Sequence, residues 1–257
     1  MCEEGKTTVS STGRLRVKTA LVTGGAKRLG RAICLALAQN GANIILHYNA
    51  STTEAEDTAQ DLRKHGGEVS TLSADLSDPE QAKKLFADAL EIVPSVDILI
   101  NNASIFPADR LDTLSLEGLA ENLNINALSP LVLSTAFAEQ NRPGTIINLL
   151  DARILDYDKE HVSYHLSKRV LHTLTCMMAL EYAPTIRVNA VAPGLILPPE
   201  GKDEEYLKSL ANSNPLNTHG TADEVADAVL FLLNAEFITG QVIYIDGGRH
   251  LKGHLYA

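Results

Sequence analysis

The sequence has no run of about 18 or more consecutive apolar residues, the least that a transmembrane helix requires, and it contains only three cysteines. Its polar N-terminus lacks the apolar centre of a signal peptide, so we expect a cytoplasmic protein without a membrane span. Cys2, Cys34 and Cys176 are odd in number and far apart, which argues against a disulfide scaffold and against a CxxC metal or redox site. We interpret Cys2 as a tail thiol and the other two as buried helix positions.

Positive charge is also scarce, because 22 Lys and Arg face 32 Asp and Glu and give a formal net charge of −10. Nucleic-acid affinity rests on Lys and Arg that neutralise phosphates, so we expect no nucleic-acid partner. The His, Cys and carboxylate residues do not cluster at metal-ligand spacings, and no metal is expected. The apolar share of 45% and the charged share of 21% are ordinary for a globular protein and exclude a disordered chain.

Short β-rich runs alternate with longer stretches of helical spacing, a pattern typical of parallel βαβ units. We therefore predict a Rossmann-type doubly wound α/β fold with a parallel seven-stranded sheet. It forms a single domain over residues 17–257 after a flexible tail at residues 1–16. Strands are expected at residues 19–22, 43–47, 68–72, 97–100, 145–150, 187–191 and 242–245, and helices near 30–40, 52–65, 79–91, 117–140, 161–182 and 222–233. The long irregular connection is expected to form a substrate loop over about residues 195–220.

A glycine-rich turn, TGGAKRLG at residues 23–30, follows the first expected strand and opens a helix. Glycines let the backbone approach a pyrophosphate, and a helix N-terminus offers free N–H groups and a positive dipole end. A tight loop without any ligand is the alternative interpretation. The position in the first βα unit favours a dinucleotide site.

The second expected strand ends without a carboxylate, since residues 47–51 read HYNAS. An NAD site usually carries Asp or Glu about 20 residues past the glycines. Lys27, Arg28 and Arg31 surround the glycine turn and favour a 2′-phosphate, so NADPH is the expected cofactor. The alternative is that these are solvated charges, which would oppose the helix dipole unless an anion binds there. Residues 5–53 carry no Asp or Glu, so the acidic chain has a basic start suited to the phosphates of NADPH.

Tyr164 and Lys168 lie four residues apart in a helical stretch, so both project from one helix face. An ammonium about 5 Å from the phenol would lower the tyrosine pKa toward the range for general acid catalysis. By itself the pair could equally be a surface tyrosine beside a solvated lysine. Its place after the fifth expected strand favours the catalytic interpretation.

Together these residues resemble the short-chain dehydrogenase/reductase family from about residue 18 to residue 251. The sequence also carries NNA at residues 101–103, Asn126 in the following helix, Pro193-Gly194 after the sixth strand, and DGG at residues 246–248. The resemblance implies that Lys168 also binds the nicotinamide ribose and that Asn126 supports a proton-relay water. It further implies a homotetramer formed through long helices such as 117–140 and 161–182.

Three details are similar to the pteridine reductase branch, which includes the dihydromonapterin reductases. Arg28 stands where most relatives have glycine. NASIF at residues 102–106 resembles the segment that gives Ser104 to the cofactor phosphates and Phe106 to a sandwich of the pterin against nicotinamide. Asp151, thirteen residues before Tyr164, occupies the place of the usual catalytic serine.

The resemblance assigns a full set of contacts. Catalytic residues are Asp151, Tyr164, Lys168 and Asn126. Cofactor contacts are Gly24, Lys27, Arg28, Leu29, Gly30, His47, Asn49, Ser51, Asp75, Leu76, Asn102, Ala103, Ser104, Tyr164, Lys168, Pro193 and Gly194. Substrate contacts are Arg28, Ser104, Phe106, Asp151, Tyr164, Leu195 and Ile196. Two positions depart from the branch, because Ala50 stands where an arginine is usual and Ile196 replaces a polar residue.

The expected reaction is hydride transfer from NADPH to a carbon of a C=N bond in a dihydropterin, with the Asp151/Tyr164 pair protonating the adjacent nitrogen. An ionised aspartate accepts hydrogen bonds and does not donate them, so it suits a substrate with N–H groups better than a ketone oxygen. Its charge would raise the pKa of Tyr164 and oppose Lys168. A carbonyl or 3-oxoacyl reductase of the same family is the alternative enzyme, and a cofactor-binding protein without turnover is the alternative class. For Phe106, the alternative to pterin binding is a role in packing.

Overall fold

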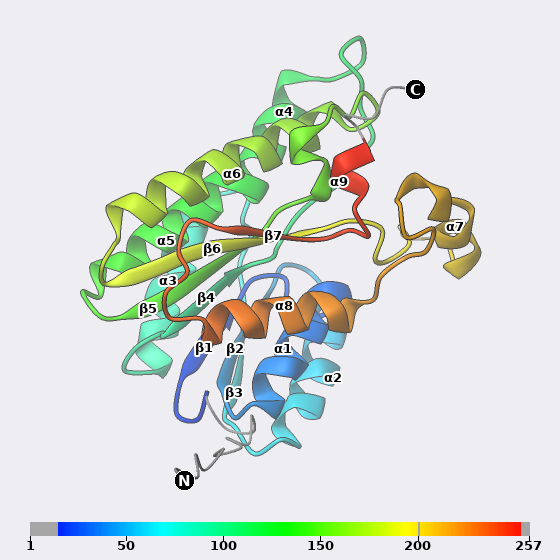
Figure 1. Cartoon of the computed structure of the whole chain (residues 1–257). Coiled ribbons are helices and arrows are strands. Elements are labelled where there is room, and N and C mark those ends of the chain that lie inside the picture. Colours follow the sequence, from blue (N-terminus) through cyan, green and yellow to red (C-terminus); the bar gives the residue numbers. More distant parts are fainter. Residues whose placement is uncertain (1–14, 200, 253–257) are drawn as a thin grey trace, which may run out of the picture.

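The structure is a computed structural model that describes residues 15–199 and 201–252. Its centre is a seven-stranded sheet in which every neighbouring pair is parallel, with the order β3-β2-β1-β4-β5-β6-β7 (Figure 1). The chain therefore forms the single Rossmann-type α/β domain that the sequence predicts. The strand order reverses between β1 and β4, and in such sheets ligands bind at the carboxyl ends of the strands beside this switch point.

The elements alternate along the chain as the sequence pattern indicates. The strands are β1 (Thr19–Val22), β2 (Asn43–Tyr48), β3 (Val69–Ser73), β4 (Ile98–Asn101), β5 (Gly144–Leu149), β6 (Ile186–Pro193) and β7 (Val242–Ile245). The helices are α1 (Arg28–Gln39), α2 (Thr52–Arg63), α3 (Pro79–Ile92), α4 (Leu116–Leu123), α5 (Ser129–Glu139), α6 (Val162–Glu181), α7 (Glu204–Ser209), α8 (Ala222–Asn234) and α9 (Arg249–Lys252). Short 3₁₀ turns lie at Ala152–Leu155 and Ala211–Ser213.

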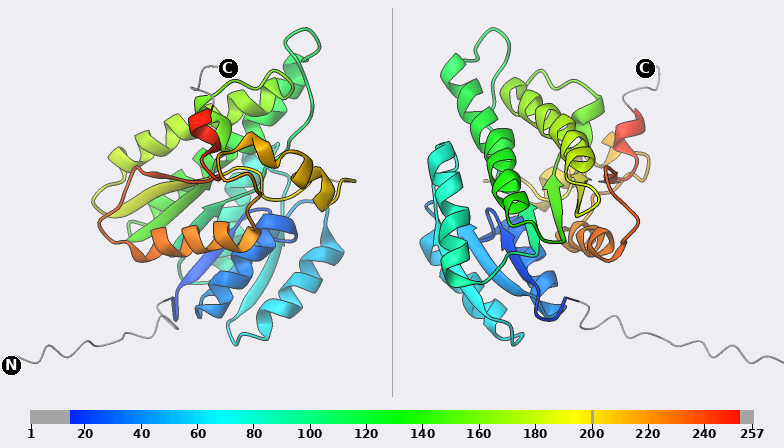
Figure 2. Two further views of the ribbon diagram at one scale, coloured as in Figure 1. Left: turned by 45° about the vertical axis from the view of Figure 1, so that its right-hand side comes forward. Right: turned by 90° about the vertical axis from the view of Figure 1, so that its left-hand side faces the viewer.

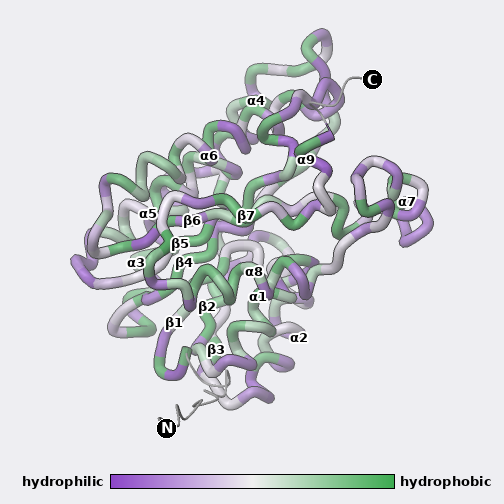
Figure 3. Tube along the Cα trace, in the orientation of Figure 1, coloured by the Kyte–Doolittle hydropathy of each residue, from purple (hydrophilic) through white to green (hydrophobic). Residues whose placement is uncertain are grey.

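Helices cover both faces of the sheet, and Figure 2 shows the sheet between the two layers. On one face α1, α2 and α8 pack against the strands through apolar residues such as Ile33, Leu62 and Val229. On the other face α3, α5 and α6 do so through residues such as Phe86 and Phe137. Figure 3 shows hydrophobic residues along β2, whereas α7 is predominantly hydrophilic. Burial of both sheet faces explains why β1, β2 and β4 are nearly continuous apolar runs, whereas the edge strand β3 is less buried and more polar.

The helix predicted near residues 117–140 is divided, because a π-helical turn at Asn124–Leu128 separates α4 from α5. The short helix α9 was not predicted. Residues 1–14 of the predicted tail lie outside the described residues, and Leu15 is already buried in the core, with its N–H bonded to the carbonyl of Asn40.

The two cysteines within the described residues differ in burial. Cys34 on α1 is buried as predicted, but Cys176 on α6 is only half-buried. The prediction for Cys176 was therefore wrong, because its side of the helix is not covered by the rest of the described chain. Cys2 lies outside the described residues.

No helix in the described part of the chain combines the length and the apolar character that a membrane crossing requires.

Candidate active site

The glycine turn between β1 and α1 is held in a shape that only glycine allows. Gly24 has a φ of +62°, and a Cβ there would approach the Cα of Ala103 to 3.0 Å. A Cβ on Gly30 would lie 2.1 Å from the carbonyl oxygen of Gly24. The amide of Asn102 donates to the carbonyls of Thr23 (2.8 Å) and Gly24 (3.1 Å). Predicted cofactor residues from β1 and β4 are thus brought together at the switch point.

His47 holds this turn in place through a hydrogen bond. The N–H of Gly24 donates to Nδ1 of His47 at 3.2 Å, and Nε2 lies 3.0 Å from the carbonyl of Ala74. Because the first partner only donates and the second only accepts, the ring is neutral with its proton on Nε2. Burial lowers the pKa of His47 to about 4. The imidazole therefore positions the turn, while a direct cofactor contact by His47 stays a prediction.

The N-terminus of α1 fits an anionic ligand. Its N-cap residue, Lys27, makes no side-chain cap bond, and its first turn carries no acidic residue. By contrast, Asp78 caps α3, Ser115 caps α4 and Thr221 caps α8. The first N–H groups of α1 lack a capping side chain and suit a diphosphate.

The three cations of the turn are placed differently from one another. Arg31 pairs with Asp61 on α2, with Nη2 and Oδ2 2.6 Å apart. Arg28 donates from Nη2 to the carbonyl of Pro198 at 2.7 Å, so it reaches across to the substrate loop. Lys27 is exposed. Asp61 is shared with Lys64, whose Nζ lies 2.7 Å from its Oδ1. The contribution of Arg31 to binding a 2′-phosphate stays a prediction.

Arg28 also adopts an unusual backbone conformation, with a φ of +55°. This left-handed region is costly for a residue with a side chain. At the other end of the cofactor region, Asn49 is exposed after β2, and Ser51 begins α2 without a side-chain cap bond. Both are open to a 2′-phosphate, and that contact stays a prediction.

Asp151, Tyr164 and Lys168 meet at the carboxyl end of β5. The Tyr164 hydroxyl donates to Oδ2 of Asp151 at 3.0 Å, and the N–H of Arg153 donates to Oδ1 at 2.7 Å. Lys168 is buried, and its Nζ donates to the carbonyl of Leu149 at 2.8 Å. Its ammonium lies 5.6 Å from the centre of the Tyr164 ring. The structure therefore brings the predicted catalytic residues together.

The pKa of Tyr164 differs from the expectation based on its spacing from Lys168. Burial raises the pKa of Tyr164 well above its ordinary value, and the charge of Asp151 raises it further. The predicted lowering by Lys168 is not seen in the protein alone, because the ammonium is directed to Leu149, whereas Asp151 contacts the hydroxyl itself. Burial also lowers the pKa of Lys168 to about 8. Tyr164 accordingly holds its proton at neutral pH and shares it with Asp151.

Asn126 lies in the π-helical turn and is fully buried. Its Oδ1 accepts from the N–H of Ile105 (2.9 Å), while its Nδ2 donates to the carbonyl of Ile105 (3.1 Å) and to the hydroxyl of Ser167 (2.9 Å). The side chain thus ties the segment after β4 to α6. The water contact predicted for Asn126 stays a prediction.

Phe106 lies beside Tyr164. Its ring centre lies 4.5 Å from that of Tyr164 in an edge-to-face arrangement and 4.0 Å from that of His161 in a stacked one. Phe106 is 49% exposed, so part of its ring remains open to a ligand. His161 in turn contacts Asp158 through Nδ1 at 3.2 Å. His161 was missed by sequence reasoning, although a histidine three residues before Tyr164 lies one helical turn away and offered a signal.

The remaining predicted residues border the same region. Ser104 is exposed, Leu29 is half-buried, and the carboxylate of Asp75 accepts the N–H of Ser77. Leu76 is buried, and its carbonyl accepts from Ser129. Gly194 after Pro193 approaches Asp246 so closely that a Cβ would lie 2.6 Å from the Asp246 Cβ. Leu195 and Ile196 are both buried, which places Ile196 in the core against Gly220. Their substrate contacts stay predictions.

Comparison with known proteins places this geometry in a family. A family profile described as Enoyl-(Acyl carrier protein) reductase matches residues 24–250. The chain is 31% identical to 3beta-hydroxysteroid dehydrogenase 1 of Eggerthella lenta, over 92% of this chain and 95% of that protein. The structure is similar to FolM alternative dihydrofolate reductase 1 of Brucella suis in complex with NADP, with a TM-score of 0.87, 32% identity and coverage of 92% and 96%. A short chain dehydrogenase of Burkholderia cenocepacia in complex with NADP matches with a TM-score of 0.87, 31% identity and coverage of 92% and 99%.

Proposed function

Because the chain belongs to the short-chain dehydrogenase/reductase family of NAD(P)-dependent oxidoreductases, we propose that it is an NADPH-dependent pteridine reductase. The proposed substrates are dihydropterins such as dihydromonapterin, or dihydrofolate. The observation that carries the proposal is the hydrogen bond from Tyr164 to Asp151. The similarity to the Brucella dihydrofolate reductase also supports it.

Asp151 suits a nitrogen heterocycle better than a ketone. A carboxylate in this position accepts hydrogen bonds, so it can hold an N–H group of a pterin. A ketone oxygen only accepts hydrogen bonds, so a ketone offers Asp151 no N–H group to hold. The open part of Phe106, beside Tyr164, offers an aromatic surface on which a flat ring can stack.

In the proposed reaction, residues of the protein transfer the proton that the ring nitrogen receives. Bound NADPH supplies a hydride to the carbon of the C=N bond. Tyr164 Oη donates its proton to the adjacent ring nitrogen, which completes addition of one hydride and one proton across the bond. Asp151 accepts a solvent proton and returns it to the phenolate oxygen along the 3.0 Å hydrogen bond. Lys168, fixed by Leu149, provides positive charge near the transient phenolate.

The preference for NADPH over NADH rests on the end of β2. No carboxylate is present among residues 47–51, and Asn49 and Ser51 can donate to a 2′-phosphate. The absence of a capping side chain at the N-terminus of α1 supports a diphosphate site there. Two of the similar solved structures are described as complexes with NADP.

A homotetramer is proposed as the assembly. Helix α6 exposes Leu166, Val170, Met177 and Leu180, an apolar surface that another copy of the chain would cover. Size-exclusion chromatography with light scattering tests this directly. The cytoplasmic location predicted from the sequence likewise remains a proposal.

A carbonyl or 3-oxoacyl reductase is the second candidate, favoured by the family profile and by the hydroxysteroid dehydrogenase relative. A substrate panel separates the two. The full chain is incubated with NADPH and either dihydromonapterin, dihydrobiopterin or dihydrofolate, or with a 3-oxoacyl thioester or a steroid ketone. Oxidation of NADPH with a dihydropterin but not with the ketones is the expected result. Activity with ketones alone overturns the proposal, and single-turnover measurements identify a binding protein that does not turn over.

A further inference from the structure

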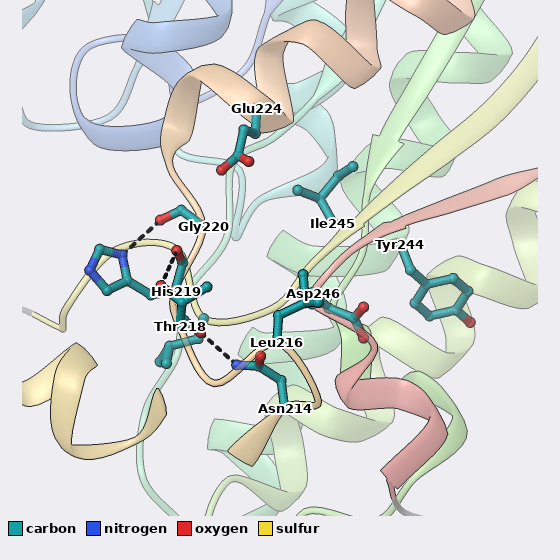
Figure 4. Close-up of a pocket in the computed structure, with 11 residues that line it drawn as sticks. Asn214, Leu216, Thr218, His219, Gly220, Glu224, Tyr244, Ile245 and Asp246 are labelled. Carbon is teal, nitrogen blue, oxygen red and sulfur yellow. Dashed lines mark hydrogen bonds between the residues drawn. The ribbon is translucent and has the colours of Figure 1, made fainter. Parts of the chain in front are cut away.

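A cavity apart from the candidate active site lies at the carboxyl ends of β6 and β7, beside the start of the substrate loop (Figure 4). Its volume is about 160 Å³, similar to a cavity that holds a benzene-sized molecule. Its lining includes neither Asp151, Tyr164 nor Phe106. The lining residues are Leu195, Asn214, Leu216, Thr218, His219, Gly220, Glu224, Tyr244, Ile245, Asp246 and Gly247.

One wall of this cavity carries an unused hydrogen-bond acceptor. Asn214 is only 1% exposed, and its Oδ1 accepts no hydrogen bond within the described residues. Its Nδ2 is occupied, because it donates to the carbonyl of Thr218 at 2.6 Å. Oδ1 faces Gly247, where a Cβ would come within 2.6 Å of it. A buried acceptor without a partner is unfavourable and calls for a donor from a ligand or water.

The charged lining residues are acidic. The side chain of Asp246 is buried and accepts three hydrogen bonds, from the N–H of Gly248, the N–H of His250 and Nδ1 of His250. The carboxylate of Asp246 therefore makes its hydrogen bonds within the chain and contributes its charge to the lining. No Lys or Arg belongs to the lining within the described residues.

Glu224 stands at the mouth of the cavity and is exposed. The N–H and the hydroxyl of Thr221 both bond to its Oε2. Nδ1 of His219, the neighbouring lining residue, contacts the carbonyl of Gly220 at 3.0 Å, and its Nε2 lies 4.0 Å from Glu204. The lining thus combines the amide of Asn214 and the carboxylates of Asp246 and Glu224 with apolar side chains.

We propose that this cavity binds a small organic cation that donates several hydrogen bonds, of the guanidinium or amidinium type. Such a group is planar, carries N–H donors on its edge for the acceptors, and presents weakly hydrated faces to Leu195, Leu216 and Ile245. Its charge complements Asp246 and Glu224. The occupant contacts Leu195, whose carbonyl accepts the N–H of Gly220 and so joins the two ends of the substrate loop. The proposal does not depend on the reaction that the enzyme catalyses.

Thermal unfolding of the full chain tests the proposal with guanidinium chloride at low millimolar concentration and constant ionic strength. Urea, a neutral molecule of the same shape, and tetramethylammonium, a cation without N–H donors, serve as control probes. A ligand that binds only the folded state raises the midpoint with ligand concentration. We expect a rise with guanidinium that follows a binding curve, and none with either control. An equal response to all three probes, or none to guanidinium, overturns the proposal.

Variants of the lining residues test whether guanidinium binds in this cavity. Glu224→Gln keeps the amide oxygen that the helix cap needs and removes the charge, so guanidinium binding is expected to weaken about tenfold or more. Thr218→Arg places a guanidinium of the chain itself in the cavity and is expected to raise the midpoint and remove the response to added guanidinium. Asp223→Asn, in the same helical turn but outside the lining, is the control. An unchanged response in Glu224→Gln also overturns the proposal, even if Thr218→Arg fails to fold.

Discussion

The phenolic oxygen of Tyr164 lies 3.0 Å from a carboxylate oxygen of Asp151, while the ammonium of Lys168 is directed to the carbonyl of Leu149. The hydroxyl of Tyr164 therefore donates its hydrogen bond to the carboxylate of Asp151, and it is not free to interact with Lys168 alone. This contact and burial both keep the proton on the phenol. Protonation of a substrate must then be coupled to Asp151.

Replacement of Tyr164 by phenylalanine removes the proposed proton donor with little change in volume. We expect kcat with a dihydropterin to fall by roughly 10² to 10⁴, the usual contribution of general acid catalysis. NADPH affinity, measured by fluorescence titration, should be nearly unchanged. A variant that keeps most of the wild-type rate would exclude Tyr164 as the donor.

Replacement of Asp151 tests the choice of substrate. In Asp151→Ser, a hydroxyl that can donate replaces an acceptor, so reduction of dihydropterins should fall at least about tenfold while ketone reduction rises. Asp151→Asn is the control, because it keeps the shape and removes the charge. Equal losses on both substrate types in Asp151→Ser would mean that the residue does not select the substrate.

His47 makes stability depend on pH. Its pKa falls from 6.5 to about 4 on folding, so the unfolded chain binds the proton more tightly and the stabilisation present above pH 6.5 is lost as pH falls toward 4. At about 1.4 kcal/mol per pH unit, this loss is about 3 kcal/mol. Urea unfolding at several pH values measures it. His47→Gln should lack this part of the pH dependence, and parallel curves for the two proteins would contradict the assignment.

Arg28 has a strained backbone, and its side chain both bonds to Pro198 and places a charge beside the proposed phosphate site. Arg28→Gly should raise the free energy of unfolding by about 1 kcal/mol, since glycine adopts a positive φ without strain. The same change removes the bond to Pro198 and a charge beside the phosphate site, so the KM for NADPH should rise several-fold. Arg28→Lys keeps the charge and the strain and is the matched comparison. If Arg28→Gly loses stability instead, the contact with Pro198 outweighs the strain.

Asn49 lies where a carboxylate would determine cofactor choice. Asn49→Asp should raise the KM for NADPH about tenfold or more, because a negative charge repels the 2′-phosphate and instead accepts from a ribose hydroxyl. The KM for NADH should fall or stay constant. Asn49→Leu, without the charge, separates repulsion from loss of the amide. Equal effects on both cofactors in Asn49→Asp would place the 2′-phosphate elsewhere.

The sequence was sufficient for the sheet and for the location of the site, because apolar runs, glycines and helix caps are local signals. Thr19–Val22 and Val242–Ile245 match their predicted ranges, and the other strands differ by one or two residues at an end. Contacts between side chains far apart in the sequence could not be predicted from it. The bond between Arg31 and Asp61 joins two helices, and the stacking of Phe106 on His161 depends on how two loops meet. The direction of Lys168 also depends on packing, since helical spacing alone places its side chain near Tyr164.

The π-helical turn at Asn124–Leu128 also limits how the gene for this protein can change in length. A π turn holds one residue more than the α-helix it interrupts, so a single deletion would restore a regular helix. Because the wider turn absorbs the extra residue, α4 and α5 keep their orientation after this deletion, and Leu133 and Phe137 stay in the core. The deletion would instead remove the turn that carries Asn126 to Ile105. A chain shortened by one residue here would therefore keep its fold and lose the link between the segment after β4 and α6.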